Sequence, residues 1–135
     1  MIKTIARKIE GLPIFMELEV LPPSVNEMYR NAGSRRYKRP EVSQWQDELT
    51  AEIRKIWCDR PAYTGEVAVY IEFVKSNRRK WDIDNRLKAI FDCFEVAGVI
   101  ENDAQISSIL AQRINGAKDS TSIVMKEYTE DSKKF

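Results

Sequence analysis

The sequence predicts one α+β domain, residues 1–135, in which two main helices pack on a mixed or antiparallel sheet of about four strands. Periodic segments follow one another in the order strand, helix, strand, helix, strand, strand, and helices layered on one sheet satisfy that order. A chain of 135 residues builds one hydrophobic core and is too short for two. Residues 1–12 and 129–135 lie outside the periodic segments, and we expect them to be flexible ends.

The first half of the chain carries one strand and one helix. Apolar and polar side chains alternate over residues 14–20, which predicts a strand. A polar loop follows and closes with a basic run at residues 35–39. Pro40 suits the first position of a helix, and apolar residues then recur at spacings of three and four up to Ile56. Pro61 marks the end of this helix.

The second half predicts one strand, one helix and two further strands, over residues 67–73, 84–97, 105–114 and 121–128. Gly98 follows the helix and suits its C-cap. Asn115 and Gly116 stand between the last two strands and form a strong hairpin signal. We therefore expect the last two strands to pair with each other.

The composition restricts the chemistry. The chain has no histidine, which excludes Ser-His-Asp and Cys-His catalysis and any histidine-ligated zinc site. Acid–base work near neutral pH then falls to carboxylates, lysine, tyrosine or metal-bound water. A net charge of +1 leaves any attraction to nucleic acid to local clusters of charge.

We expect a cytoplasmic protein that does not enter a membrane. The N-terminal residues lack the apolar run of a signal peptide, and no stretch approaches membrane-spanning length. Cys58 and Cys93 have no CxxC spacing and are interpreted as reduced thiols, with Cys93 in the core.

Asp82 and Asp84 are the most informative feature of the chain, because they stand directly behind a basic run at residues 78–80. In an extended segment, residues two apart point to the same side, so both carboxylates can bind one hard cation such as Mg²⁺ or Mn²⁺. The alternative is structural, since Asp84 is also a good helix N-cap. An EF-hand loop is excluded because Arg86 occupies a position that requires an oxygen ligand.

Lys88 and Asp103 extend this motif, and each has two interpretations. Lys88 stands one turn after Asp84, where it either forms an exposed i,i+4 ion pair or stabilises negative charge at a scissile phosphate. Asp103 is either a turn residue or a third carboxylate of the same site. Asp92 and Glu95 are interpreted as ordinary exposed helix charges.

Basic residues gather in two runs of an otherwise neutral chain. The two runs form the electrostatic footprint that we expect on DNA: Arg35, Arg36, Lys38, Arg39, Arg78, Arg79 and Lys80. Their alternative role is to keep the surface soluble, but dense clustering favours contact with phosphates.

The acidic motif resembles the signature of the RusA-type Holliday junction resolvases in two segments, Asp82-Ile83-Asp84-Asn85-Arg86-Leu87-Lys88 and Ala97-Gly98-Val99-Ile100-Glu101-Asn102-Asp103-Ala104-Gln105. Residues 21–30 resemble the family's N-terminal motif, and the similarity extends over about residues 14–128. It implies a small homodimeric α+β endonuclease that cuts four-way DNA junctions by paired nicks in recombination and repair. It also implies a requirement for Mg²⁺, for which Mn²⁺ can substitute.

The resemblance implies catalytic, metal-binding carboxylates at three positions, Asp82, Asp84 and Asp103. Lys88 matches the family's essential lysine, and Asn85 matches its motif asparagine, which we assign to DNA binding. Asn26 and Tyr29 are expected to contact DNA near the centre of the junction. A dimer with two-fold symmetry presents two such sites to opposed strands.

Two positions depart from the family pattern. Asn102 stands where an acidic residue is common, which can alter metal affinity. Trp81 stands where arginine is common, and it either weakens a phosphate contact or offers an aromatic surface to a base. Two other classes compete with a nuclease: a non-catalytic module that binds junctions or single-stranded DNA, and a structural protein whose aspartates only cap a helix. The first leaves the retained carboxylates without a role, and the second leaves the basic runs unexplained.

Overall fold

The computed structural model describes residues 4–9, 12–23, 29–32, 35–78 and 83–129. In these residues the chain forms β1 (Thr4–Ile9), β2 (Leu12–Leu18), β3 (Tyr29–Ala32), β4 (Arg35–Lys38), α1 (Pro40–Trp57), β5 (Val67–Lys75), α2 (Asp84–Val96), the 3₁₀ turn η2 (Asp103–Gln105), β6 (Ile106–Asn115) and β7 (Ser120–Glu127). None of the described helices has both the length and the apolar character needed to span a membrane.

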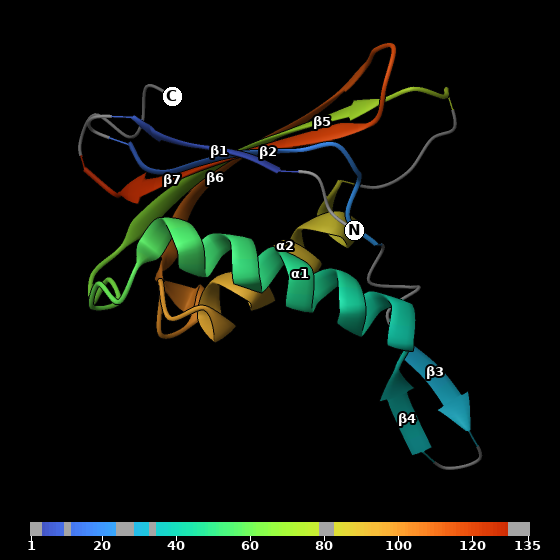
Figure 1. Ribbon diagram of the computed structural model, residues 1–135, viewed down its shortest axis with the longest axis horizontal. Helices are drawn as coiled ribbons and strands as arrows, with labels where there is room; N and C mark the ends of the chain where they lie inside the picture. The colour runs from blue at the N-terminus through green and yellow to red at the C-terminus, as the bar shows by residue number, and fades with distance from the viewer. Residues whose placement is uncertain (1–3, 10–11, 24–28, 33–34, 79–82, 130–135) are drawn as a thin grey trace.

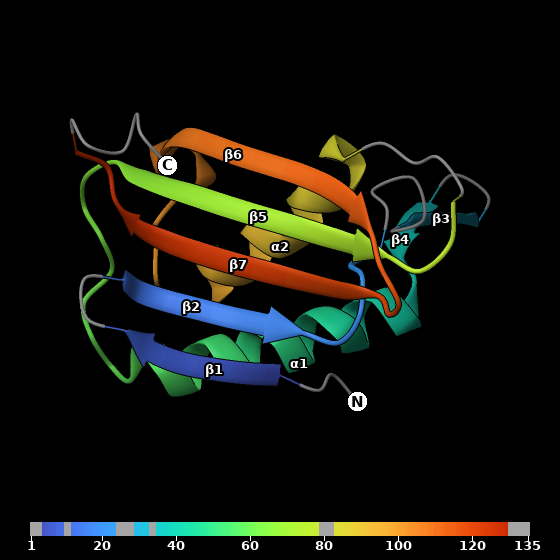
Figure 2. The same ribbon diagram turned by 90° about the horizontal axis from the view of Figure 1, so that it is seen from above.

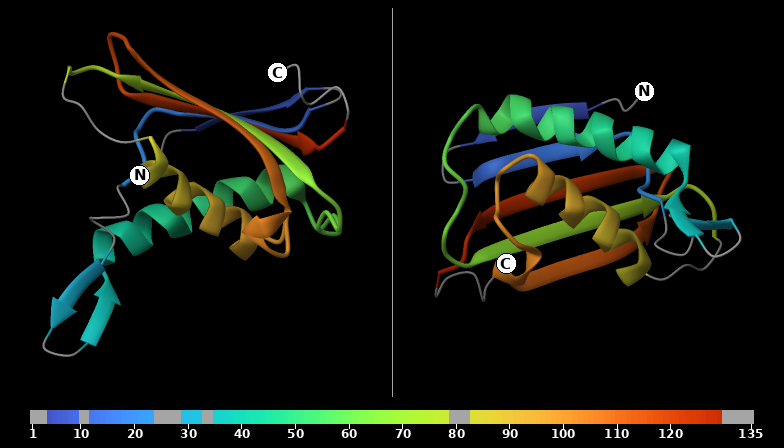
Figure 3. Two further views of the ribbon diagram at one scale, coloured as in Figure 1. Left: turned by 180° about the vertical axis from the view of Figure 1, so that it is seen from behind. Right: turned by 90° about the horizontal axis from the view of Figure 1, so that it is seen from below.

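Five strands form one mixed sheet in the order β1-β2-β7-β5-β6. Neighbouring strands are antiparallel except β5 and β6, which run parallel. Both α1 and α2 lie on the same face of this sheet (Figures 1 and 3). β3 and β4 form a separate two-stranded ribbon that projects from the beginning of α1 (Figure 1).

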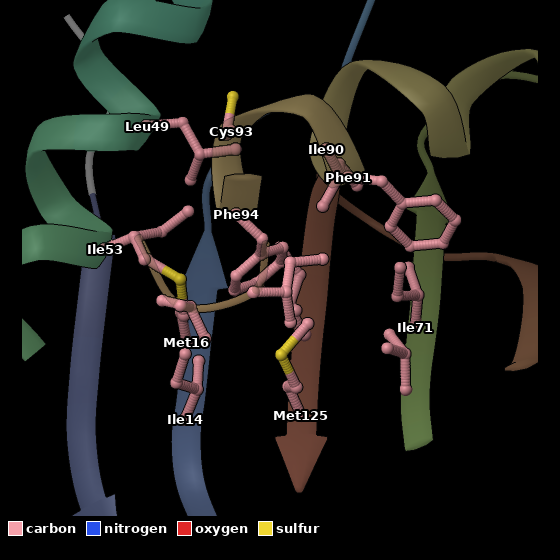
Figure 4. Close-up of a cluster of buried hydrophobic side chains, with 14 of the residues drawn as sticks. Ile14, Met16, Leu49, Ile53, Ile71, Ile90, Phe91, Cys93, Phe94 and Met125 are labelled. Carbon is pink, nitrogen blue, oxygen red and sulfur yellow. The ribbon is translucent and has the colours of Figure 1, made fainter. Parts of the chain in front are cut away.

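The core lies between the sheet and the two helices. Alternate residues of β5, Val69, Ile71 and Phe73, are fully buried. Ile53 of α1 and Phe94 of α2 belong to the same buried cluster, in which Phe94 lies between the helices and the strands (Figure 4). Burial of a side chain of this size contributes roughly 1.5–3 kcal/mol, so this layer holds α2 firmly on the sheet.

The predicted α+β class and mixed sheet are confirmed. The main sheet has five strands rather than about four, because residues 4–9 pair with β2 as an edge strand. The prediction assigns these residues to a chain end, since the sequence TIARKI alternates poorly. The ribbon of β3 and β4 is also absent from the prediction, because its two strands pair with each other outside the main sheet and leave no alternating apolar pattern.

The predicted hairpin between the last two strands is wrong. β5 lies between β6 and β7, and it pairs parallel with the first and antiparallel with the second. The physical reason is burial, because β5 is the most apolar strand and gains most from a neighbour along each edge. β5, α2 and β6 therefore form a parallel β-α-β unit that returns the chain past α2.

The strand directions bring several turns of the chain to one end of the sheet. β2, β5 and β6 run in one direction, and β7 runs in the opposite direction. The ends of β2, β5 and β6 and the beginning of β7 therefore lie together (Figure 2). The segment that leads from β5 to α2 starts here, so this end of the sheet supports the acidic motif.

Candidate active site

α2 begins at Asp84 without using it as a cap. Ile83 occupies the N-cap position, and the cap has no side-chain hydrogen bond. The charge of Asp84 lies in the first turn, where it interacts favourably with the helix dipole, and its side chain is exposed. The alternative interpretation of Asp84 as an N-cap is therefore wrong, and its carboxylate is open to a ligand.

Lys88, one turn later, is held by two other carboxylates. Its Nζ lies 2.9 Å from Asp92 Oδ1 and 3.1 Å from Asp103 Oδ2. Hydrogen bonds to Asp92 and then to Asp103 raise the pKa of Lys88 well above its usual value, so the amine is charged at neutral pH. Within the described residues its i,i+4 ion pair is with Asp92 rather than with Asp84, and the pair with Asp103 is additional.

Asp103 is fixed through its backbone, which leaves its carboxylate for other contacts. The Asp103 N–H donates to Glu95 Oε1 of α2 at 2.6 Å. Asn102 is the N-cap of η2, and its Oδ1 accepts from the Ala104 N–H at 2.7 Å. The Asp103 side chain is 38% exposed, so a ligand can reach the oxygens that face Lys88.

Gln105 ties this turn to the rest of the domain. Its Oε1 accepts from the N–H groups of Glu101 and Asn102, and its Nε2 donates to the carbonyls of Tyr63 and Gly65. Gln105 and Asn102 together complete a capping box. Asparagine and aspartate can both accept the N-cap hydrogen bond from the Ala104 N–H. Asparagine at position 102 therefore keeps the turn that an acidic residue would form.

The structure brings two of the predicted catalytic residues, Lys88 and Asp103, into direct contact across 15 positions of sequence. Asp84 lies one turn before Lys88, about 6 Å along the helix axis. Asp82 lies outside the described residues. Among the residues that are described, no three His, Cys, Asp or Glu side chains gather as a metal site. The three-aspartate site therefore stays a prediction.

The oxygen donors near the face of α2 that carries Asp84 and Lys88 suit a hard divalent cation. Asp84 and Asp103 offer accessible carboxylate oxygens, which Mg²⁺ and Mn²⁺ prefer. Cys93 of α2 is buried, as expected, and burial raises the pKa of its thiol to about 11. No thiolate from Cys93 therefore competes for the cation, and the chemistry of the donors fits Mg²⁺ better than zinc.

The first basic run lies on the ribbon, whose second strand ends at Lys38. Lys38 Nζ donates to Gln46 Oε1 at 2.6 Å, and Gln46 Nε2 donates to the Ala89 carbonyl of α2 at 3.1 Å. Gln46 is only 6% exposed, so its hydrogen bond to Ala89 is buried, whereas the one from Lys38 is partly buried. Through Gln46, Lys38 at the base of the ribbon is linked to Ala89, the residue after Lys88 in α2.

The remaining DNA-binding assignments stay predictions. The backbone places Tyr29, Arg35 and Arg36 in the ribbon, Arg39 at the N-cap of α1, Arg78 at the exit of β5 and Asn85 in the first turn of α2. The other predicted DNA-binding residues, Asn26, Arg79 and Lys80, lie outside the described part of the chain. Trp81, which departs from the family pattern, also lies outside it.

Sequence reasoning missed three residues that shape this site. Asp92 and Glu95 are not ordinary surface charges, because one pairs with Lys88 and the other holds Asp103. Their signal is visible in the sequence, since they follow Lys88 by one and two helical turns and share its face. Gln46 carries no such signal, because its partner Ala89 is 43 positions away.

Comparison with known proteins connects this geometry to a family. Residues 19–126 match the family model described as endodeoxyribonuclease RusA. A protein named crossover junction endodeoxyribonuclease RusA from Aquifex aeolicus (strain VF5) is 35% identical over 122 residues, which cover 85% of this chain and 92% of the relative. A protein of the same name from Escherichia coli (strain K12) is 33% identical over 85 residues, or 63% of this chain and 70% of the relative. One from Enterobacteria phage 82 has the same identity and coverage.

Proposed function

Because the chain belongs to the RusA endodeoxyribonuclease family, we propose that it is a metal-dependent endodeoxyribonuclease that resolves four-way DNA junctions by paired nicks. The relatives are named for action on crossover junctions. The observation that carries the proposal is the contact between Lys88 and Asp103 on the face of α2 that begins with Asp84. Its substrate is branched DNA, and its proposed place of action is recombination and repair in the cytoplasm.

Asp82, Asp84 and Asp103 are the proposed ligands of Mg²⁺ or Mn²⁺. A cation bound there supplies activated water and neutralises charge on the scissile phosphate. The exposed carboxylates of Asp84 and Asp103 leave this side of α2 accessible to a DNA backbone. Glu95 and Gln105 keep Asp103 in place through its turn, so the ligand is presented by a fixed backbone.

Lys88 is the proposed stabiliser of negative charge at the phosphate. Its raised pKa keeps the amine protonated across the neutral range. The ion pair with Asp92 would keep Lys88 on the same face if Asp103 turned to a bound cation. Asp92 is thus a positioning residue for the lysine.

The two basic runs are proposed to bind the DNA backbone. Neutralising Arg78, Arg79 and Lys80 together is expected to weaken junction binding. The slope of log affinity against log salt should become shallower by about 0.9 for each phosphate that the variant no longer neutralises. Binding measured over a salt series checks this, with Lys55 and Lys118 neutralised as the control. An unchanged slope in the triple variant would show that the run is only a solvated surface.

We also propose a homodimer in which the free edge of β6 pairs with its counterpart in a second copy. β6 lies at the end of the sheet order and, in the described part of the chain, pairs only with β5. Its side chains Ile109, Leu110 and Ile114 are 47%, 43% and 43% exposed. Adjacent residues of a strand point to opposite faces, so Ile109 and Leu110 are exposed on both sides of the sheet. An added strand covers both sides, whereas packing on one face covers only one.

Aspartate at both Ile109 and Leu110 should convert a dimer to a monomer, because charges along a strand edge oppose sheet extension. The molar mass of the full chain, measured by light scattering at micromolar concentration, gives the result. Val96→Asp is the matched control, since Val96 is an exposed apolar residue, 64% accessible, away from this edge. A monomeric wild type, or a dimer that survives the double substitution, would contradict the interface.

The function is tested by incubating the protein with a synthetic four-way junction, with and without Mg²⁺. Paired nicks in opposed strands that require the cation support a resolvase. Tight binding without nicks at any Mg²⁺ or Mn²⁺ concentration identifies a non-catalytic junction-binding module instead. Linear duplex of the same sequence is the control for structure selectivity.

A further inference from the structure

The connection from β6 to β7, residues 116–119, crosses the end of β5. β5 lies between these two strands, so a short connection has to pass over the point where β5 ends (Figure 2). At that point the chain leaves the sheet toward Arg78, and α2 begins at Asp84. We call this connection, together with Asn115 at the end of β6, the crossing loop.

The crossing loop contacts the last residues of β5 closely. The Gly116 N–H donates to the Lys75 carbonyl at 2.9 Å. Asn115 Nδ2 donates to the Asn77 carbonyl at 2.8 Å and lies 3.4 Å from the Lys75 carbonyl. A Cβ atom at Gly116 would lie 2.5 Å from Val74 Cγ1, so a side chain here would force Val74 to shift.

Asp119 completes the contact from the other end of the crossing loop. Its Oδ1 accepts from both the N–H and the Oγ of Ser76, each at 2.8 Å. These hydrogen bonds, with a smaller effect from the charge of Lys75, lower the pKa of Asp119. The carboxylate is therefore ionised at neutral pH. Since Ser76 is exposed, these hydrogen bonds rather than burial hold it in place.

The beginning of β7 supports a second segment at this end of the sheet. Thr121 Oγ1 donates to the Val20 carbonyl at 2.8 Å, where the chain leaves β2. Arg86 of α2 donates from Nη1 to the Pro22 carbonyl at 2.7 Å. The exit of β2 is thus held by β7 and α2, and the exit of β5 is held by the crossing loop.

We propose that the crossing loop positions the exit of β5, with Asp119 and Asn115 as positioning residues for Ser76, Asn77 and the chain that continues through Arg78. The inference rests on the proposed nuclease function. Six positions separate Ser76 from Asp82, and α2 fixes the far end of the segment between β5 and α2 at Asp84. Fixing Ser76 and Asn77 therefore restricts the start of the connection that leads to the acidic motif. A misplacement of about 1 Å at a catalytic group can cost roughly a hundredfold in rate.

Three variants test the role of Asp119. Asp119→Ala removes the acceptor of both Ser76 hydrogen bonds, and Asp119→Asn keeps an oxygen at that position. Lys118→Ala changes an exposed neighbour in the same loop and is the control. Hydrogen–deuterium exchange is measured on the metal-free protein in peptides spanning residues 75–84. We expect faster exchange there in Asp119→Ala and near wild-type exchange in the other two variants.

Single-turnover cleavage of a four-way junction gives the second measurement. Asp119→Ala should react about tenfold more slowly, or slower still, and should need more Mg²⁺ for half of its maximal rate. Asp119→Asn should restore both values. Ser76→Ala, which removes only the Oγ hydrogen bond, should change both in the same direction by less, and it replaces Asp119→Ala if that variant does not fold.

Wild-type exchange over residues 75–84 in Asp119→Ala would overturn the proposal. Faster exchange spread equally over α1 and β7 would also overturn it, because that pattern reports general destabilisation. If the wild-type protein itself does not cleave junctions, the proposed function fails, and the exchange measurement still decides whether the crossing loop holds the segment.

Discussion

Asp103→Asn is expected to lower the rate of junction cleavage by more than about a hundredfold, because partners of metal ligands alone cost roughly 10–100-fold when removed. The substitution preserves size and removes the charge proposed to bind Mg²⁺. Junction affinity should stay the same or increase, since a negative charge near the phosphates is removed. Nicking and gel-shift affinity are measured in parallel. Asp82→Asn is expected to behave in the same way.

Comparing Asp92→Asn with Asp103→Asn tests whether Asp103 is a metal ligand or only an ion-pair partner of Lys88. Both Asp92 and Asp103 pair with the Lys88 amine, but only Asp103 is a proposed metal ligand. If Asp103 acts solely through the lysine, the two substitutions should have similar effects. A loss in Asp103→Asn that greatly exceeds the loss in Asp92→Asn supports the metal site, and wild-type cleavage in Asp103→Asn would exclude it.

Lys88→Met is expected to slow cleavage by roughly a hundredfold or more, on the scale of removing one group that stabilises charge in the transition state. The fold should survive, because the Lys88 side chain is 50% exposed and its ion pairs are solvated. Single-turnover cleavage at saturating enzyme isolates the chemical step from binding. Urea unfolding of the same variant checks the stability.

Lys55→Met is the matched control. Lys55 is also a helical lysine in an ion pair, 3.0 Å from Glu52, and its side chain is 72% exposed. Removing it should leave the cleavage rate unchanged. A Lys88→Met rate within threefold of wild type, a difference of about 0.7 kcal/mol, would return Lys88 to the role of a surface ion pair.

Periodicity predicted the elements of the core well. A helix expected over residues 84–97 is observed as α2, Asp84–Val96, because apolar side chains at helical spacing have to share one buried face. The strand expected over residues 67–73 is observed as β5, since its alternation reflects burial against the helices. Residue chemistry likewise identified the candidate carboxylates and Lys88, which have no place in a hydrophobic core.

The pairing of the strands required the tertiary structure. Asn115 and Gly116 carry a hairpin signal, yet the strands that they join have β5 between them. Local turn chemistry predicts a tight change of direction and does not specify which strand becomes the neighbour. The choice depends on how much apolar surface each arrangement buries, which is a property of the whole sheet.

The partners of Lys88 also depend partly on local sequence and partly on the tertiary structure. Asp84 and Asp92 both lie one turn from Lys88, so the sequence determined that the lysine had acidic neighbours and left open which one it meets. Asp103 comes within reach only because the parallel unit of β5, α2 and β6 returns the chain past the helix. The sequence by itself determined the elements and the candidate groups, because periodicity and charge are local. The tertiary structure decided which groups meet, because their contact depends on long-range burial.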